Sequence, residues 1–269
     1  MNTRRTAVVT GAGAGIGLAI AQRLDSEGYC VVGIERSPEA AAKAEQSLSN
    51  GGVIIVGDVA DRAVLAQARR KAEESGVLSA WVNNAGVAIG GNLHEPNDEE
   101  VERVISVNLL GVYWGCAEAV QSFIANGVAG AVVNISSIHG RAAFPGWAAY
   151  DTAKGGVDAL TRYLAVEYGP LGIRANAIAP GAIRTDMVSR VIADAPDSQQ
   201  AEIEMSAIHP LERLGEPSEI ASTAAFLVSE AASFISGQSI AVDGAATARC
   251  FRYEPSSEIK SILAARGRV

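Results

Sequence analysis

Blocks of apolar and polar positions alternate along the chain. Short runs of valine, isoleucine and alanine recur between alanine-rich segments whose apolar side chains have helical spacing, such as residues 18–28 and 63–76. Because the short runs are apolar at successive positions, helices are expected to cover both faces of the sheet that they form. The pattern predicts a doubly wound parallel α/β sheet of about seven strands, at residues 6–10, 30–34, 53–57, 80–83, 130–136, 173–179 and 238–242.

Two segments interrupt this pattern. Residues 184–212 are long and polar where a strand-to-helix connection is usually short, which predicts a substrate lid. Met187 in this segment is a candidate to close over a substrate, and an ordinary amphipathic helix is the alternative. Residues 245–269 follow the last predicted strand as a tail with five basic and two acidic side chains. No linker to a second domain is found, so residues 1–269 are expected to form a single domain.

The composition argues against several kinds of partner. The chain has 269 residues and a formal net charge of −8, without a compensating run of basic residues, so no nucleic-acid partner is expected. No apolar stretch reaches the roughly 20 residues of a membrane span. The histidines and cysteines lack the spacing of a metal site. The three cysteines are scattered, which favours reduced thiols and a cytoplasmic protein.

A glycine-rich stretch follows the first predicted strand. In VVTGAGAGIGLAI, residues 8–20, the spacing is Gly11-x-x-x-Gly15-x-Gly17, with Ile16 between the last two glycines. At the start of a helix, such a turn aims backbone N–H groups at a phosphate, which indicates a dinucleotide site. The alternative is a tight turn without a ligand. A Walker A loop is disfavoured because no Gly-Lys-Ser or Gly-Lys-Thr follows.

Two charged residues follow at the end of the second predicted strand. Glu35 lies 24 residues past Gly11, where a carboxylate accepts hydrogen bonds from both hydroxyls of an adenosine ribose and repels a 2′-phosphate. This position favours NAD. Arg36 leaves NADP open, because a guanidinium at this point is suited to a 2′-phosphate. A solvated Glu-Arg pair is the third interpretation.

Candidate catalytic groups occur farther along the chain. In YDTAK, Tyr150 and Lys154 lie one turn apart on a predicted helix. An ammonium within about 4 to 6 Å favours a phenolate and lowers the pKa of a phenol. Ser137 closes the run AVVNISS, thirteen residues before Tyr150, and is expected at the carboxyl edge of the sheet.

Together these motifs resemble the short-chain dehydrogenase/reductase family. The resemblance covers residues 6–244 and rests on TGAGAGIG (10–17), DV (58–59), NNAG (83–86), Asn108 in VISVNLLG, NISS (134–137), YDTAK (150–154) and PGAIRT (180–185). It implies a Rossmann-like fold, a nicotinamide cofactor, and hydride transfer between that cofactor and a secondary alcohol or ketone. Such enzymes are commonly tetramers, so a homo-tetramer or dimer is expected. The tail is expected either to join the subunit interface or to be a frayed terminus.

The resemblance also implies roles for individual residues. Tyr150 corresponds to the general acid/base and is also a cofactor contact. Lys154 lowers its pKa and binds the nicotinamide ribose, and Ser137 holds the substrate oxygen. Asn108 corresponds to a residue that helps to carry a water-linked proton relay. A phenolate beside an ammonium suits this reaction, because the alcohol proton must leave as the hydride does.

Further positions correspond to cofactor contacts in the family. Asp58 matches a carboxylate that contacts the adenine amino group, with Val59 beside the ring. Two loops match the remaining contacts, one on the ribose side and one at the nicotinamide carboxamide: Asn84, Ala85 and Gly86, then Pro180, Gly181, Ile183 and Thr185. A purely structural role is the alternative at each position.

The substrate side of the site is less defined. His139, two residues past Ser137, is expected either to contact a polar substrate group or to cap the loop. Trp147 is expected to form an apolar wall. Arg141 and Arg184 flank the region, and either is suited to a substrate carboxylate or phosphate. Secondary alcohols, hydroxysteroids, polyols and β-hydroxyacyl groups all stay open as substrates.

The motifs therefore predict an NAD-dependent alcohol dehydrogenase or ketone reductase. An NADPH-preferring carbonyl reductase, with Arg36 on the 2′-phosphate, is the alternative among enzymes. The fold also permits a non-catalytic nucleotide sensor, but a sensor has no chemical need for Ser137, Tyr150 and Lys154 together. A sugar-nucleotide epimerase is disfavoured, because such enzymes usually need a larger C-terminal substrate portion.

Overall fold

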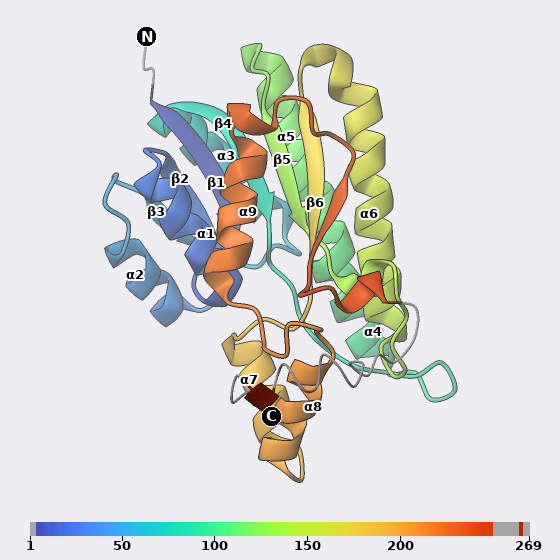
Figure 1. The fold of residues 1–269 in the computed structure, drawn as a ribbon. Coiled ribbons are helices and arrows are strands. Elements are labelled where there is room, and N and C mark those ends of the chain that lie inside the picture. The colour runs from blue at the N-terminus through green and yellow to red at the C-terminus, as the bar shows by residue number, and fades with distance from the viewer. Residues whose placement is uncertain (1–3, 250–263, 266–269) are drawn as a thin grey trace.

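The computed structural model describes residues 4–249 and 264–265, which are built around one parallel sheet (Figure 1). Its seven strands lie in the order β3-β2-β1-β4-β5-β6-β7. They are β1 (Arg5–Thr10), β2 (Cys30–Glu35), β3 (Val53–Val56), β4 (Val77–Asn83), β5 (Ala131–Ile135), β6 (Arg174–Pro180) and β7 (Ser239–Val242). Each strand overlaps one of the predicted apolar runs, so the doubly wound parallel sheet is confirmed.

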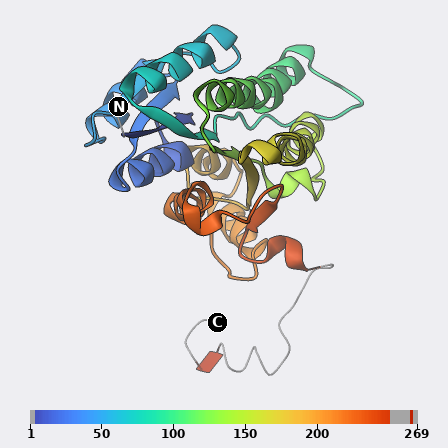
Figure 2. The ribbon, with the colours of Figure 1, turned by 90° about the horizontal axis from the view of Figure 1, so that it is seen from above.

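The helices form a layer on each face of the sheet (Figure 2). Along a strand the side chains alternate: Val8 and Trp81 pack with one layer, whereas Ala7 and Val82 pack with the other. This alternation explains why successive strand positions are all apolar. One layer contains α1 (Gly15–Ser26), α2 (Pro38–Gln46) and α9 (Pro217–Val228), and the other contains α3 (Arg62–Ser75), α5 (Val112–Asn126) and α6 (Ala148–Tyr168).

A chain of buried polar groups crosses the centre of the sheet. Asn83 Oδ1 accepts a hydrogen bond from Trp81 Nε1 at 2.8 Å, and Asn83 Nδ2 donates to Asn134 Oδ1 at 2.9 Å. Asn134 Nδ2 donates in turn to Thr161 Oγ1 at 3.0 Å. Buried amides are tolerated when they are hydrogen-bonded in this way. The chain of bonds joins β4, β5 and α6.

The segment expected to be a lid folds into two helices, α7 (Asp186–Ala193) and α8 (Ser198–Ala207), beyond the carboxyl ends of the strands (Figure 1). Arg184 pairs with Glu202 of α8 at 3.0 Å and with Glu216, just before α9, at 3.4 Å. The first pair links α8 to the segment after β6, and the second links that segment to the start of α9.

Only part of the predicted tail is described. Residues 245–249 contain a short 3₁₀ turn, Ala246–Ala248, and residues 264–265 are helical. The rest of the tail, on which its expected interface role falls, lies outside the described residues. Within residues 4–249 and 264–265, no helix has the length and apolar character that crossing a membrane requires.

Candidate active site

A cavity of about 490 Å³ lies at the carboxyl edge of the sheet. Its walls include the glycine turn after β1, Glu35 at the end of β2, the loop after β4, the first turn of α6 and one side of α7. The strand β1 lies between β2 and β4, so successive connections leave it in opposite directions. Doubly wound sheets bind ligands at such a point.

The glycine turn brings backbone segments unusually close together. Gly11 and Gly15 have φ angles of +64° and +52°, in the left-handed region that glycine adopts without strain. A Cβ atom on Gly17 would lie 1.9 Å from the carbonyl oxygen of Gly11, so no side chain fits there. The helix α1 begins at Gly15 and directs its free N–H groups toward the cavity. Ile16 lines the cavity beside it.

The loop after β4 is tied to the glycine turn. Thr10 Oγ1 accepts hydrogen bonds from the backbone N–H groups of Asn84 and Ala85, both at 2.9 Å. The Asn84 side chain donates to the carbonyl oxygens of Thr10 at 3.0 Å and Gly11 at 3.2 Å. Asn84 therefore braces the turn, and together with Ala85 and Gly86 it lines the cavity.

Glu35 lies directly against the same turn. Its Oε2 accepts a hydrogen bond from Gly13 N at 3.1 Å, and its Oε1 accepts one from Ser37 N at 2.9 Å. A Cβ atom on Gly13 would lie 2.5 Å from Cγ of Glu35, so only a glycine allows this contact. Arg36, the next residue, is exposed and is not among the described residues that line the cavity.

Asp58 follows β3 and has a cationic partner that the motifs did not indicate. Its Oδ2 is 2.8 Å from Arg103, in α4 (Asp98–Ile105), and its Oδ1 accepts a hydrogen bond from Ala60 N at 2.9 Å. Partial burial would raise the pKa of Asp58, but these bonds and the charges of Arg103 and Arg36 hold it below its ordinary value. Asp58 is therefore a charged acceptor at neutral pH, and Val59 beside it is buried.

Ser137 and Tyr150 come together at the cavity. Ser137 follows β5, and Tyr150 lies in the first turn of α6. Burial raises the pKa of Tyr150, a hydrogen bond with Ser137 opposes this rise, and the charge of Asp151 adds to it. The net direction is opposite to the lowering expected from the sequence, because burial outweighs the stabilisation that the protein itself gives to the phenolate.

Lys154 is one turn farther along α6 and is 3% exposed. Its Nζ donates to the carbonyl oxygen of Ile135 at 2.8 Å and lies 5.5 Å from the centre of the Tyr150 ring. Burial lowers the pKa of Lys154 to about 8, and the carboxylate of Asp158 opposes that shift. At neutral pH the ammonium form still predominates, so a positive charge lies beside the phenol.

Asn108 lies in an irregular helical segment. The helix α4 continues into α5 through six residues of π-helix, Ser106–Gly111, a form that is frequent at functional sites. The Asn108 side chain donates to Val87 O and accepts from Val87 N, both at 2.8 Å. These bonds hold the loop after β4 against the helix. The role of Asn108 in a proton relay stays a prediction.

An aromatic cluster forms the wall next to Tyr150. The His139 ring stacks on Phe144, with ring centres 4.0 Å apart, and meets Trp147 and Tyr150 edge-on at 5.7 and 5.2 Å. Its Nδ1 is 2.6 Å from Asp151 Oδ1. Burial lowers the pKa of His139, and the bond to Asp151 opposes the shift. With Nδ1 occupied, Nε2 is the ring nitrogen left for a polar group in the cavity.

The segment after β6 forms the remaining wall. Ala182 O accepts a hydrogen bond from Gly215 N at 2.9 Å, and Arg184 N donates to Gly215 O at 2.8 Å. Because N–H and C=O point in opposite directions across a planar trans peptide, these bonds turn the N–H and C=O of Ile183 away from Gly215. The residues expected to contact the carboxamide all line the cavity: Pro180, Gly181, Ile183 and Thr185.

The two arginines considered for substrate recognition have other partners. Arg184 forms the ion pairs with Glu202 and Glu216 described above. Arg141 donates to the carbonyl oxygen of Ser239 on β7. Neither lines the cavity, whereas Trp147 and Met187 do.

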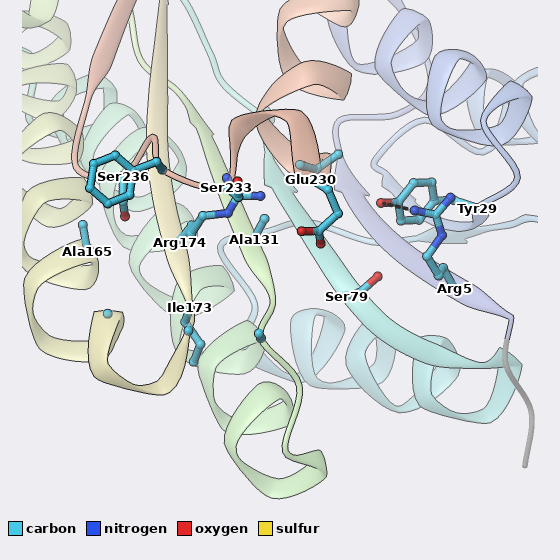
Figure 3. Close-up of a pocket in the computed structure, with 15 residues that line it drawn as sticks. Arg5, Tyr29, Ser79, Ala131, Ala165, Ile173, Arg174, Glu230, Ser233 and Ser236 are labelled. Carbon is cyan, nitrogen blue, oxygen red and sulfur yellow. Dashed lines mark hydrogen bonds between the residues drawn. The ribbon is translucent and has the colours of Figure 1, made fainter.

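A second cavity, of about 420 Å³, opens elsewhere, beside the start of β1 and β6 (Figure 3). Arg5 stacks there on the Tyr29 ring at 4.4 Å, and Arg174 donates to the carbonyl oxygens of Leu227 and Ser229 at 2.7 and 3.1 Å. These guanidinium groups already hold neighbouring elements together. No residue of the seven motifs lines this cavity, so the candidate chemistry lies in the first one.

Comparison with known proteins shows the family. A family model described as enoyl-(acyl carrier protein) reductase matches residues 11–247. The 3beta-hydroxysteroid dehydrogenase 1 of Eggerthella lenta is 37% identical over 248 residues, which are 90% of this chain and 94% of that protein. Glucose 1-dehydrogenase 2 of Bacillus subtilis is 38% identical over 251 residues, which are 91% and 95% of the two chains. The chain belongs to the short-chain dehydrogenase/reductase family.

A solved structure agrees with this assignment. Actinorhodin polyketide ketoreductase with NADPH is 30% identical and has a TM-score of 0.86, over 91% of this chain and 99% of that chain. As a short-chain dehydrogenase/reductase, the protein is an oxidoreductase that acts on alcohol or ketone groups with a nicotinamide cofactor. This confirms the reaction class predicted from the motifs.

Some residues of this dehydrogenase/reductase site were not predicted. Thr10 and Gly13 lie in the glycine-rich stretch. The position of Thr10 at the end of the first predicted strand, and the additional glycine at position 13, were the only signals of their contacts. Arg103, Asp151 and His209 meet their partners only in the folded chain, and no spacing in the sequence indicates those contacts.

Proposed function

We propose that this enzyme is NAD-dependent and interconverts a secondary alcohol and its ketone, with the reacting carbon on a largely apolar skeleton. The observation that carries the proposal is the convergence of Ser137, Tyr150 and Lys154 on the cavity that also contains the glycine turn and Glu35. The scattered cysteines support a cytoplasmic protein, and Cys30 and Cys116 are buried free thiols.

Tyr150 holds the transferred proton on its phenol oxygen. In the oxidation, the substrate O–H bond breaks and its proton passes to the phenolate of Tyr150. A bound oxidised nicotinamide would supply the acceptor for the hydride that leaves the carbon bearing this oxygen. Ser137 Oγ bonds the same substrate oxygen and orients it. The ammonium of Lys154 favours the phenolate against the effect of burial. In the reduction, Tyr150 returns the proton.

The residues present fit a dinucleotide, and they favour NAD. Residues 11–15 carry no side chain larger than a methyl group, so their backbone N–H groups are open to a diphosphate. The bonds from Gly13 and Ser37 hold the Glu35 carboxylate beside the turn, where it accepts from ribose hydroxyls and repels a 2′-phosphate. Arg36 is exposed and does not line the cavity, which weakens the NADP alternative. The ketoreductase with NADPH is the reason to measure both cofactors.

The walls around Tyr150 favour an apolar substrate skeleton with one polar group. Apolar side chains from α7, α8 and the loop before α6 surround this end of the cavity: Phe144, Trp147, Met187, Val188, Val191, Met205 and Ile208. Among them, His139 offers Nε2 to a polar group. This lining suits a cyclic or steroid-like alcohol, as the name of the Eggerthella lenta relative says of that protein, better than a polyol. In this proposal α7 and α8 form the lid.

A second copy of the chain is the proposed macromolecular partner. Exposed apolar side chains gather on α5 and α6, where Tyr113, Tyr163 and Val166 are 48%, 56% and 80% exposed. Apolar surface of this kind is typical of subunit contacts. Sedimentation of the purified protein is expected to give a dimer or tetramer, and Val166→Glu is expected to shift it toward smaller species. A wild-type monomer at micromolar concentration would remove this part of the proposal.

The substrate proposal is tested by a matched panel. Cyclic secondary alcohols, hydroxysteroids and polyols are incubated with NAD⁺, and NADH formation is followed by absorbance. The apolar alcohols are expected to give the higher kcat/KM, and Tyr150→Phe is expected to lower kcat by about 10²- to 10⁴-fold. A preference for polyols would contradict the proposed substrate class alone. A kcat for Tyr150→Phe that stays close to the wild-type value would contradict the mechanism. Binding of NADH without turnover of any alcohol or ketone would favour the sensor.

A further inference from the structure

His209 joins three segments that are far apart in the sequence. It follows α8, is 2% exposed, and lies between the loop after β6 and the turn after β7. Its Nδ1 is 2.6 Å from the carbonyl oxygen of Asp243, and the backbone N–H of Ala182 donates to its Nε2 at 3.1 Å. A Cβ atom on Gly181 would lie 2.3 Å from Cε1 of the ring, so the ring occupies space that only a glycine leaves open.

These two bonds define the chemical form of the ring. A carbonyl oxygen can only accept, so Nδ1 carries a hydrogen. A backbone N–H can only donate, so Nε2 presents its lone pair. His209 is therefore neutral and in the Nδ1–H tautomer. A charged ring, or the other tautomer, would place a second hydrogen against the N–H of Ala182.

The bond to Ala182 acts on the backbone of the next residue. Gly215 holds the peptide plane between Ala182 and Ile183 through the carbonyl oxygen of Ala182. His209 holds the preceding plane, between Gly181 and Ala182, through the N–H. Because each peptide unit is rigid, holding both planes fixes the backbone torsions of Ala182. The direction of the Ile183 backbone is then fixed as well.

We propose that His209 is a positioning residue for the nicotinamide end of the cofactor. The inference rests on the proposed function, because it requires the segment at residues 180–185 to bind that end. The glycine turn and Glu35 are proposed to bind the adenosine and diphosphate part of the cofactor, and His209 contacts neither of them. Loss of the His209 bonds therefore affects one half of the cofactor and spares the other.

Titration with NADH and with ADP-ribose separates the two halves, because ADP-ribose lacks the nicotinamide. His209→Phe keeps a planar ring and removes both hydrogen bonds. It is expected to bind NADH about 3- to 10-fold more weakly and ADP-ribose as tightly as wild type. His209→Gln, whose amide both donates and accepts, is expected to recover part of the loss. His94→Phe is the matched control, because His94 is exposed, and it is expected to change neither affinity.

Nitrogen NMR of the wild-type imidazole tests the same inference without cofactor. A neutral Nδ1–H ring at pH 7 is expected. A charged ring or an Nε2–H ring would overturn the inference. It would also be overturned if His209→Phe bound NADH as tightly as wild type, or if its affinities for NADH and ADP-ribose fell equally. Wild-type protein that bound neither NADH nor NADPH would overturn the proposed function together with this inference.

Discussion

The carboxylate of Glu35 accepts a hydrogen bond from the backbone N–H of Gly13 at 3.1 Å. This bond links the end of β2 to the glycine turn after β1, so the acidic side chain cannot swing freely into solvent. Its position relative to the turn is therefore set before any cofactor binds. A preformed acceptor of this kind binds with less loss of side-chain entropy than a mobile one.

Replacement of Glu35 by alanine is expected to exchange the cofactor preference. Wild type is expected to bind NADH more tightly than NADPH, because a carboxylate repels a 2′-phosphate. Glu35→Ala is expected to weaken NADH binding and improve NADPH binding, as measured by nicotinamide fluorescence. Arg36→Ala is the companion variant and is expected to leave the NADH affinity unchanged. Tighter NADPH binding by wild type, lost in Arg36→Ala, would favour the reductase alternative.

Tyr150→Phe is expected to lower kcat by about 10²- to 10⁴-fold and to leave NADH binding unchanged. The phenylalanine keeps the ring that packs against His139 and Trp147, so only the proton-carrying group is removed. Tyr168→Phe is a suitable control, because Tyr168 lies at the far end of α6. Steady-state kinetics and cofactor titration on the same preparations distinguish a chemical defect from a folding defect.

Asp151→Asn is expected to raise KM for the alcohol while kcat with a saturating substrate changes little. The asparagine removes the charge that holds His139 Nδ1 at 2.6 Å, so the ring no longer presents Nε2 in one orientation. His139→Phe is expected to give a similar rise, and the double variant no more than either single one. Additive effects in this cycle would show that the two residues act independently.

The buried ammonium of Lys154 is expected to make stability depend on pH. Its pKa is about 8 in the folded protein and near 10.4 in an unfolded chain. Between these values the unfolded chain binds the extra proton, so the free energy of unfolding rises with pH. From pH 8 to pH 10, wild type is expected to gain about 2 kcal/mol relative to Lys154→Met. Urea denaturation of both proteins at both pH values measures this gain. A difference in free energy of unfolding between wild type and Lys154→Met that is the same at pH 8 and pH 10 would contradict the prediction.

The apolar runs were sufficient to predict the sheet, because burial on both faces leaves a continuous signal at each strand. The strand β4 begins at Val77, three residues before the predicted start, because the polar Ser79 interrupts the apolar run there. The two helices between residues 184 and 212 were harder to predict. Their N-caps, Thr185 and Asp197, are polar residues that also occur in loops.

The motifs predicted that Ser137, Tyr150 and Lys154 lie together at one edge of the sheet, and these residues do line one cavity, but the motifs did not reveal how the side chains are held. The bond between His139 and Asp151 spans twelve residues, and that between His209 and Ala182 spans twenty-seven. Such pairs depend on loop paths that local propensity does not determine. The direction in which the pKa of Tyr150 shifts could not be predicted from the sequence either, because the extent of its burial depends on how the cavity is packed.

The buried amides of Asn83 and Asn134 select one alignment of β4 and β5. Both strands carry apolar side chains on both faces, and a slip by two residues would leave each side chain on the same face. The same slip would separate Asn83 from Asn134, which are opposite each other, and would break the hydrogen bond from Asn83 Nδ2 to Asn134 Oδ1. A buried donor or acceptor that is left unpaired costs about 1–3 kcal/mol. Among the apolar side chains of these two strands, this polar pair thus sets the position of Ser137, which follows β5 at the cavity.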